Sequence, residues 1–391
     1  DLVPSLLLDD GLTDFPHRVH AALNDILDLV RRVGVDGSVL EVEGLEAGLR
    51  DQATEIQELC RANACRSIRE ARDAAERDQL WAGRRGAFGA LARISPSFLV
   101  ADCTVPRTQL TAALERVAAI ADEYGFGYGN VLHAGDGNLH PLLFFDARDP
   151  DEVKRVHKAG WEVMRACVEL GGTITGEHGV GIEKIAAMRL LFSEDDLGYQ
   201  RTIWRVFDPC GLLNPGKVFP EPREPEPRPE PEGTEIAGEL RPSGVEEACA
   251  MVRAAFLQSK ALLPVGGGRR ADYGNASDRE LVPLHSSGLD GVIEYDAANQ
   301  VVTLGAGMTL ATAQELLAEH NQWLPLRPPL ADGCTLGGLA ALNACGPERL
   351  AYGAPRDRLL GLRFISGEGR LIKAGGKVMK NVAGYDVTRL L

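Results

Sequence analysis

No two cysteines in this sequence have the C-x-x-C spacing of a metal or redox motif. The eight cysteines are scattered, which argues against a zinc ribbon, an iron–sulfur cluster and a disulfide framework, and favours a reducing compartment such as the cytoplasm. No segment concentrates Lys and Arg, and the net charge is -14, which argues against nucleic-acid binding. No uncharged apolar run approaches the roughly 20 residues that a membrane-spanning helix needs.

The 391 residues are enough for two domains, and 45% hydrophobic with 25% charged residues is typical of globular chains. The clearest boundary is the segment 221–233, which contains five prolines, five glutamates and no residue suited to a core. This composition predicts an extended linker of ~3.1 Å per residue, with a proline-rich recognition segment as the alternative. We expect a first domain over 1–220, a linker over 221–234 and a second domain over 235–391.

Before the linker, apolar residues recur at helical spacing in five segments, and shorter apolar or alternating runs lie between them. A turn sequence within 131–146 predicts a hairpin. We therefore expect an α+β fold in which helices cover one face of an antiparallel sheet. The predicted helices are 15–33, 47–60, 73–91, 108–124 and 152–170; the predicted strands are 38–42, 66–69, 98–102 and the two arms of the hairpin.

The second domain is expected to mix helices and strands as well. Ser243 and Glu246 have capping-box spacing, which predicts the start of a helix that reaches residue 258. Two short strands on either side of 296–300 predict a hairpin. The other predicted elements are strands at 262–265 and 362–366 and a helix at 309–320.

The most informative segment is 133–140, which has a histidine at each end and glycine turn chemistry between them. If 135–138 form a four-residue loop, His133 lies directly opposite His140, at a Cβ separation of ~5 Å that lets two imidazoles bind one ion. A lone histidine is more often a core residue, but a pair opposed across a glycine turn is not easily explained that way. We expect a metal site, with a structural role of the pair as the alternative.

A third ligand is expected from the glycine-rich segment 171–181. Glu177 and His178 are adjacent there, so they cannot easily bind one ion in the same way. We assign Glu177 to the metal and His178 to proton transfer, because histidine exchanges protons near neutral pH. The alternative is a glycine-rich loop with a polar tip.

Two glycine-rich turns after the linker predict a phosphate-binding site. The first follows a predicted strand, and its backbone amides are able to surround a pyrophosphate. The second opens an apolar helix, whose N-terminus favours an anion. Neither has the pattern of a Rossmann fold or a P-loop, and a plain turn is the alternative for each. The candidate cofactor-binding residues are Gly266, Gly267, Gly268 and Arg269 in the first turn and Thr335, Leu336, Gly337 and Gly338 in the second.

Several longer motifs before the linker resemble the C-terminal domain of the FAD-linked oxidases, the family of glycolate oxidase and of D-lactate and D-2-hydroxyglutarate dehydrogenases. They are HAGDGNLHP from residue 133, GEHGVG from 176, WAGR from 81, DCTVPR from 102, and 207–217. The resemblance is to the D subunit of glycolate oxidase, and it implies that His133, His140 and Glu177 hold a divalent metal of the Zn or Mn type. It also implies that His178 is the catalytic base and that Arg84 binds the substrate carboxylate.

The part after the linker resembles an FAD-binding domain of the PCMH or VAO type, and within that type the E subunit of glycolate oxidase. The resemblance rests on 328–338, on 352–357 and on GKVMKNVAGYD at 376–386. It implies that the two glycine-rich turns bind the pyrophosphate of FAD. Relatives continue with a further glycine-rich strand after this segment, so we expect a partial FAD-binding domain.

The resemblance implies part of a flavin-dependent oxidoreductase that oxidises a 2-hydroxy acid with metal-assisted proton abstraction and hydride transfer to FAD. A non-catalytic assembly or electron-transfer subunit of a glycolate oxidase complex is the alternative; a zinc hydrolase leaves the FAD-like half unexplained. The expected partners are the small acid and an iron–sulfur subunit, with a cytoplasmic location at the inner face of the membrane. We expect the isolated chain to bind metal, to bind FAD weakly at most, and to oxidise no 2-hydroxy acid.

Overall fold

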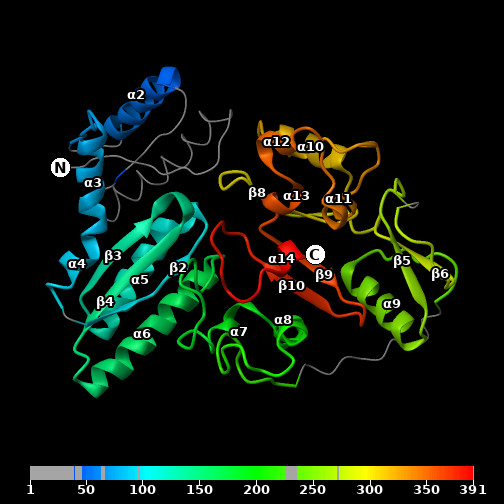
Figure 1. Ribbon diagram of the computed structural model, residues 1–391, viewed down its shortest axis with the longest axis horizontal. Helices are drawn as coiled ribbons and strands as arrows, with labels where there is room; N and C mark the ends of the chain where they lie inside the picture. The colour runs from blue at the N-terminus through cyan, green and yellow to red at the C-terminus, as the bar shows by residue number, and fades with distance from the viewer. Residues whose placement is uncertain are drawn as a thin grey trace. The chain divides into compact units, whose positions relative to one another are not determined.

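The computed structural model describes residues 39, 46–62, 67–95, 97–224, 236–270 and 273–390 (Figure 1). The predicted helix over 15–33 and nearly all of the strand over 38–42 lie outside the described residues, as does most of the predicted linker. The chain divides into two compact units. Unit 1 is Asp1–Leu191, Gly216–Pro220 and Gly376–Gly384; unit 2 is Phe192–Pro215, Glu221–Gly375 and Tyr385–Leu391. Each unit therefore combines segments that are far apart in the sequence.

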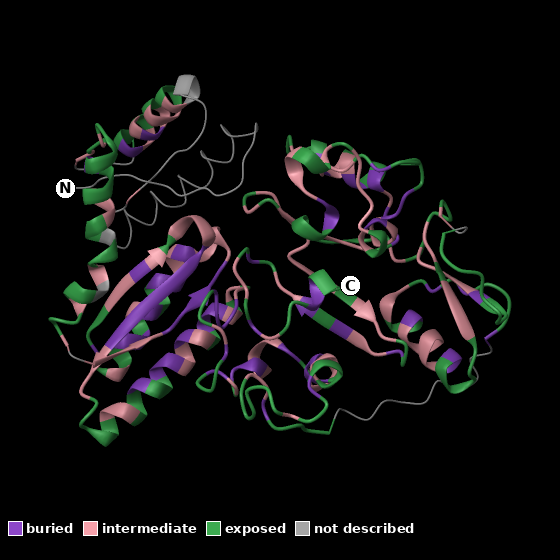
Figure 2. Cartoon of the chain, viewed as in Figure 1, coloured by how far each residue is buried: buried purple, intermediate pink, exposed green. Residues whose placement is uncertain are grey.

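Unit 1 contains a four-stranded antiparallel sheet, as the sequence predicts. Its central strand is β4 (Asn138–Phe145), which pairs with β3 (Tyr128–His133) along one side. β1 (Ser97–Val100) and β2 (Cys103–Thr104) pair with β4 along the other side. Most of β4 is buried (Figure 2), because neighbouring strands flank it on both sides and helices cover one face.

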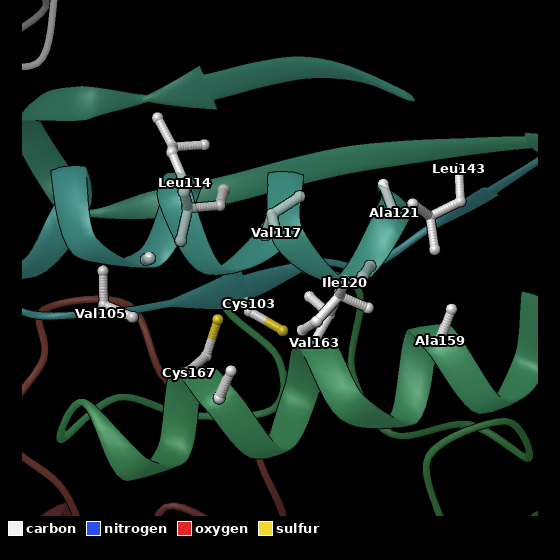
Figure 3. Close-up of a cluster of buried hydrophobic side chains, with 14 of the residues drawn as sticks. Cys103, Val105, Leu114, Val117, Ile120, Ala121, Leu143, Ala159, Val163 and Cys167 are labelled. Atoms are coloured by element: carbon white, nitrogen blue, oxygen red, sulfur yellow. The ribbon is translucent and has the colours of Figure 1, made fainter. Parts of the chain in front are cut away.

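The main core of unit 1 lies between the sheet and two helices, α5 (Leu110–Tyr124) and α6 (Pro150–Glu169). Figure 3 shows Leu114 and Val117 of α5 near Val163 and Cys167 of α6, with Cys103 of the sheet beside them. These five residues are all at most 1% exposed, and a fully buried Leu or Val side chain contributes about 1.5–3 kcal/mol. The helices thus fix one face of the sheet.

The opposite face of the sheet carries polar side chains, because successive residues of a strand alternate between faces. In β4, Leu139 and Leu143 belong to the core, so Asn138 and His140 face away from it. Within residues 101–105, the side chain of Cys103 belongs to the core. The residue before it, Asp102, is also buried, but it lies on the other face, together with Asn138 and His140. The sequence pattern therefore separates a packing face from a face with chemical groups.

Local signals explain where α6 begins and where α5 ends. The Asp149 carboxylate accepts a hydrogen bond from the Asp151 N–H at 2.8 Å, and Pro150 is the first residue of α6, where its missing N–H costs nothing. α5 ends at Gly125, which has φ 71°, a left-handed conformation that favours glycine. The predicted helices over 108–124 and 152–170 are confirmed within a few residues.

The N-terminal part of unit 1 is helical where the sequence predicts it. The predicted helix over 73–91 is confirmed with a break at Gly86. The predicted strand over 66–69 is wrong: the described residues there form no strand, and the Arg69 guanidinium instead pairs with Glu76 at 2.6 Å. Glu76 also accepts the Arg72 backbone N–H at 3.0 Å, so this segment is held by a side chain rather than by a neighbouring strand. The helices are α2 (Glu46–Ala62), α3 (Ala74–Arg85), α4 (Ala87–Leu91) and, later in the chain, α7 (Met188–Leu191).

Over its described residues, unit 2 holds three two-stranded sheets and short helices. β5 (Ala261–Val265) and β6 (Leu281–His285) are parallel. β7 (Val292–Asp296) and β8 (Val301–Leu304) form the predicted hairpin, and β9 (Gly361–Ile365) pairs with β10 (Leu371–Gly375), a strand that the sequence analysis missed. The helices are α8 (Glu194–Phe207), α9 (Val245–Leu257), α10 (Leu310–Ala318), α11 (Leu336–Leu342), α12 (Arg349–Tyr352), α13 (Pro355–Arg358) and α14 (Val387–Leu390).

The start of α9 differs from the prediction by one residue. Gly244, not Ser243, is the N-cap, and the Ser243 N–H and hydroxyl both donate to Glu247 at 2.7 Å. The sequence predicts Glu246 as the acidic partner of Ser243 in the capping box. In the structure this partner is Glu247, one position later. None of the described helices combines the length and the apolar composition that a membrane crossing requires.

Candidate functional site

The hairpin that carries the two histidines has a different register from the predicted one. β3 and β4 pair His133 with Asn138 and Val131 with His140, so the two histidines are not directly opposed. Residues two apart in a strand share a face, however, so His133 lies on the same face as His140, as its diagonal neighbour. Their ring centroids are 5.6 Å apart. The predicted proximity is correct, although the predicted pairing is wrong.

The turn explains the difference in register. A 3₁₀ turn over Ala134–Asp136, followed by Gly137 with φ 72°, connects the strands, so Asn138 is already paired and the predicted loop over 135–138 is wrong. Gly137 packs tightly against Val105, the residue that follows β2. The Gly137 carbonyl accepts the Val105 N–H at 2.9 Å, and a Cβ on residue 137 would lie 2.0 Å from the Val105 carbonyl oxygen. Position 137 therefore requires glycine for two separate reasons.

The glycine-rich segment after α6 brings a carboxylate to the histidines. Glu177 Oε2 lies 3.6 Å from His140 Nε2, and Glu177 Oε1 lies 3.9 Å from His133 Nε2. The three candidate ligand atoms all lie within 4.8 Å of one another. The ring of His178 stacks on the ring of His140 with centroids 5.1 Å apart. The structure thus brings together the four residues that the sequence analysis assigned to metal and base.

The three side chains suit a divalent ion. Zn–N and Zn–O bonds of about 2.0–2.2 Å in tetrahedral geometry place two ligand atoms about 3.4 Å apart, so the 3.6 Å separation is close to this value and the wider ones need an inward shift of the side chains. Two imidazoles and a carboxylate are donors that Zn and Mn accept. Burial lowers the pKa of His140, despite the nearby Asp102 and Glu177 carboxylates, which favours the neutral imidazole that a metal binds.

A buried carboxylate that the sequence analysis did not assign organises this site. Asp102 accepts hydrogen bonds from the backbone N–H groups of Glu177 at 3.0 Å and His178 at 2.8 Å. It also accepts from the Thr175 hydroxyl at 2.7 Å and from the Asn138 amide at 2.8 Å. Burial opposes its ionisation, but these hydrogen bonds outweigh burial and lower the pKa of Asp102. The charged carboxylate therefore fixes the dipeptide that carries one ligand and the candidate base.

Asp102 also reaches the histidine ligand. Its Oδ1 lies 3.8 Å from His140 Nδ1, the nitrogen opposite the one that faces Glu177. This distance is too long for a hydrogen bond, so the carboxylate acts on the imidazole through its charge, which increases the basicity of the ring. The Lys184 ammonium donates to the backbone carbonyls of Asp102 and Ile174 at 2.8 and 3.0 Å. It therefore links the backbone at Asp102 to the segment that leads to Glu177. The sequence signal was an acidic residue at the end of the predicted apolar strand over 98–102, where a buried charge needs partners.

We expect Asp102→Asn to weaken Zn²⁺ binding by about 10–100-fold, the usual cost of losing a group that supports metal ligands. Asparagine has nearly the same shape, but it removes the negative charge and turns an NH₂ donor toward groups that are themselves donors. Isothermal titration calorimetry of the full chain measures the effect. Asp151→Asn, an exposed site on α6, serves as the matched control and should leave the affinity unchanged. Equal affinities for both variants would contradict this role of Asp102.

The structure packs the two glycine-rich turns of unit 2 against each other. A Cβ on Gly267 would lie 1.7 Å from the Gly333 carbonyl oxygen, and a Cβ on Gly266 would lie 2.2 Å from Thr335 Oγ1. The Arg269 guanidinium donates to the backbone carbonyl of the residue before Gly333 at 2.7 Å. The close packing of the turns is therefore sufficient reason for glycine at these two positions, and cofactor binding by Gly266–Arg269 stays a prediction.

The backbone amides at the start of α11 already donate within unit 2. Their acceptors are Met308 O for Leu336 at 2.9 Å, Ala306 O for Gly337 at 2.8 Å, and Thr335 Oγ1 for Gly338 at 3.3 Å. A pyrophosphate would have to compete with these bonds. We therefore expect the amides of the first turn, rather than those of 336–338, to make the phosphate contacts.

Arg84 and the motif over 207–217 contribute less to the description of the site. Arg84 lies in α3, and its side chain is outside the described residues, so its role as carboxylate anchor stays a prediction. In the motif over 207–217, the Asp208 carboxylate accepts the backbone N–H groups of Leu212 and Leu213 at 2.9 and 2.8 Å. This residue closes a turn.

Comparison with known proteins shows relatives for both parts of the chain. Glycolate oxidase subunit GlcD of Escherichia coli (strain K12) is 37% identical over 221 residues, which are 56% of this chain and 44% of GlcD. D-lactate dehydrogenase of Archaeoglobus fulgidus is 34% identical over 152 residues, 39% of this chain and 34% of that protein. Glycolate oxidase subunit GlcE of Escherichia coli (strain K12) is 42% identical over 102 residues, 26% of this chain and 29% of GlcE. The chain spans less than half the length of each of these relatives.

Two protein families match the chain at the positions where the site residues lie. Residues 37–218 match the family "FAD linked oxidases, C-terminal domain", and this range includes the sheet, both histidines and the Glu177–His178 dipeptide. Residues 236–375 match the family "FAD binding domain", and this range includes both glycine-rich turns. The predicted combination of helices with an antiparallel sheet and an FAD-binding domain is confirmed. The chain therefore carries a region that matches the C-terminal domain of the FAD linked oxidases, followed by a region that matches an FAD binding domain.

Proposed function

We propose that the chain is part of a flavin-dependent oxidoreductase that converts a 2-hydroxy acid of the glycolate or D-lactate type into the 2-oxo acid. The observation that carries the proposal is the convergence of His133, His140 and Glu177 beside His178, within a domain of the FAD linked oxidases. The substrate class is supported by the relatives, which are glycolate oxidase subunits and a D-lactate dehydrogenase.

The reaction removes a hydride from Cα of the acid and a proton from its hydroxyl group. A bound divalent ion would supply Lewis acidity toward the hydroxyl, and FAD would supply the hydride acceptor. His133, His140 and Glu177 would hold the ion, and Arg84 would pair with the substrate carboxylate. His178 would accept the hydroxyl proton as the general base.

The different exposure of the two stacked histidines supports this division of roles. His140 is 4% exposed and surrounded by packed side chains, which suits a ligand that stays in place. His178 is exposed, so a substrate is able to reach its ring. Its backbone is fixed by the hydrogen bond to Asp102, and the stacking of its ring on His140 holds the imidazole beside the proposed ligands.

We extend the proposal to the partners of the chain. One part is similar to a GlcD subunit and the other to a GlcE subunit, which supports assembly into a complex of the glycolate oxidase type. Such a complex would include an iron–sulfur subunit as the electron acceptor and would work at the cytoplasmic face of the membrane. The linked domains would raise each other's local concentration in that assembly.

A binding experiment tests the proposal without requiring turnover. The full chain, stripped with a chelator and dialysed, is expected to take up about one Zn²⁺ or Mn²⁺ per chain, as one group of three ligands predicts. The loaded chain is expected to bind glycolate or D-lactate in calorimetry, and the stripped chain is expected not to, because the ion holds the hydroxyl and carboxylate. Binding of the acid that is independent of metal, or no uptake of metal, would contradict the proposal. A non-catalytic subunit would show metal uptake without any binding of the acid.

A further inference from the structure

A segment from near the end of the sequence belongs to the metal-ligand unit. Residues 376–384, which follow the FAD-binding family match, are grouped with unit 1. The Asn381 side-chain oxygen accepts the Thr173 hydroxyl at 3.0 Å, and the Val382 N–H donates to the Thr175 carbonyl at 3.3 Å. These contacts hold the segment against the stretch of chain that leads directly to Glu177.

The same segment places a cation on the candidate metal ligand. Lys380 Nζ lies 2.5 Å from Glu177 Oε1 and 2.9 Å from Asp136 Oδ2. Glu177 Oε1 is the oxygen that faces His133, whereas the other oxygen faces His140. Lys380 thus binds Oε1 of Glu177 and leaves Oε2, the oxygen that faces His140, for a metal ion.

An ammonium group in this position has few chemical uses. It has three donors and no lone pair, so Lys380 is not a metal ligand. When a divalent ion binds to Glu177, the site contains the two charges of the ion and one of Lys380, against one each on Glu177 and Asp136; the charge of Asp102 is balanced by Lys184, 3.8 Å away. One positive charge is then in excess, and two cations on one carboxylate repel each other. A monocarboxylate between them neutralises the excess and gives the ammonium a new acceptor.

We propose that Lys380 is a substrate-binding residue, whose ammonium pairs with the carboxylate of the 2-hydroxy acid beside the metal ion. The inference rests on the proposed function and adds a residue to it. Before substrate binds, Lys380 is held by Asp136 and Glu177; on binding, it exchanges the Glu177 oxygen for a carboxylate oxygen of the acid. Arg84 and Lys380 then provide two cations for one anionic substrate, from parts of the sequence that are far apart.

The interactions of Lys380 are consistent with a charged group ready for this exchange. Its ammonium is bound to two carboxylates, Asp136 at 2.9 Å and Glu177 at 2.5 Å, so it already pairs with carboxylate oxygens of the kind that the substrate offers. Lys380 and Glu177 are both partly exposed, so water and a small anion are able to reach them.

The test compares Lys380→Met with Lys377→Met in the full chain. Both variants remove one positive charge from the same segment, and Lys377 is exposed. The probes are Zn²⁺ alone and then oxalate, a mimic of a 2-hydroxy acid that does not react, titrated into the zinc-loaded protein. Lys380→Met is expected to bind Zn²⁺ at least as tightly as the wild type and to bind oxalate about 10–100-fold more weakly, as the loss of a charged hydrogen bond predicts. Lys377→Met should match the wild type in both titrations.

Three outcomes would count against the inference. Equal binding of oxalate to Lys380→Met and wild type shows that the ammonium does not hold the anion. Weaker Zn²⁺ binding by Lys380→Met shows that Lys380 only supports Glu177. In both cases the wild type still binds metal and oxalate, so the proposed function stands while this inference fails. A wild-type chain that binds no Zn²⁺ overturns both.

Discussion

Alanine in place of His133, His140 or Glu177 is expected to weaken Zn²⁺ binding by two orders of magnitude or more. Zinc sites with four protein ligands bind with about 10–16 kcal/mol, so one ligand accounts for roughly 3 kcal/mol, which is about a hundredfold. The His178→Ala variant is expected to keep its metal affinity, because the ring of His178 stacks on a ligand and is not itself in the ligand group. Calorimetry or metal analysis of the four full-length variants measures the difference.

His178→Ala is the internal control for the three ligand variants, because it removes an imidazole from the same cluster. In the assembled oxidoreductase, we expect this variant to lose turnover by roughly 10²–10⁴-fold, the usual contribution of a general base. Equal loss of metal in all four variants would show that the division of roles between Glu177 and His178 is wrong. Full metal affinity in all four variants would show that these residues do not form a metal site.

Gly137→Ala is expected to destabilise unit 1 strongly, by about 3 kcal/mol or more. A left-handed conformation costs an alanine roughly 1–2 kcal/mol. Its Cβ would also meet the Val105 carbonyl oxygen at 2.0 Å, so the backbone of the turn or of the neighbouring strand has to move. Because Gly137 lies between the strands that carry His133 and His140, we expect metal binding to fall as well. Urea unfolding followed by circular dichroism, together with a zinc titration, measures both effects.

Gly125→Ala separates the two causes. Gly125 also has a left-handed φ, 71°, but a Cβ there would meet only the Arg155 guanidinium at 3.9 Å, an ordinary contact. This variant should therefore show only the conformational cost, roughly 1–2 kcal/mol, and normal zinc binding. If the two alanine variants lose the same stability, the close approach at Gly137 is not what determines its cost.

The secondary structure of unit 1 could largely be predicted, because helical spacing and turn residues are local signals. The predictions over 108–124 and 152–170 correspond to α5, which ends at Gly125, and α6, which the Asp149 side chain caps at its start. The strand predicted over 66–69 failed because a short run of residues does not show whether a partner strand exists. β10 was missed for the same reason, since its pairing with β9 is a tertiary property.

The sequence predicted which residues come together in the candidate site, but it did not predict the hairpin register or the long-range contacts around it. Histidines, a glutamate and glycine turns stand out in a sequence, and the structure brings them together. The register of the hairpin depends on one residue in the turn, and a shift of one position changes every pair. The contacts that Asp102 and Lys380 make with Glu177 span 75 and 203 residues, which no spacing pattern contains.

The position of Lys380 in the sequence affects the order in which the site is assembled during translation. A nascent chain emerges from the ribosome from its N-terminus, so both histidines and Glu177 are available well before Lys380, which follows Glu177 by 203 residues. At ~5–20 residues per second, the delay is roughly 10–40 s. During this interval the sheet, α5 and α6 are already synthesised, and a divalent ion would meet the three proposed ligands without a competing ammonium. Under the proposed function, vectorial synthesis would therefore favour loading of the metal first and arrival of the lysine second.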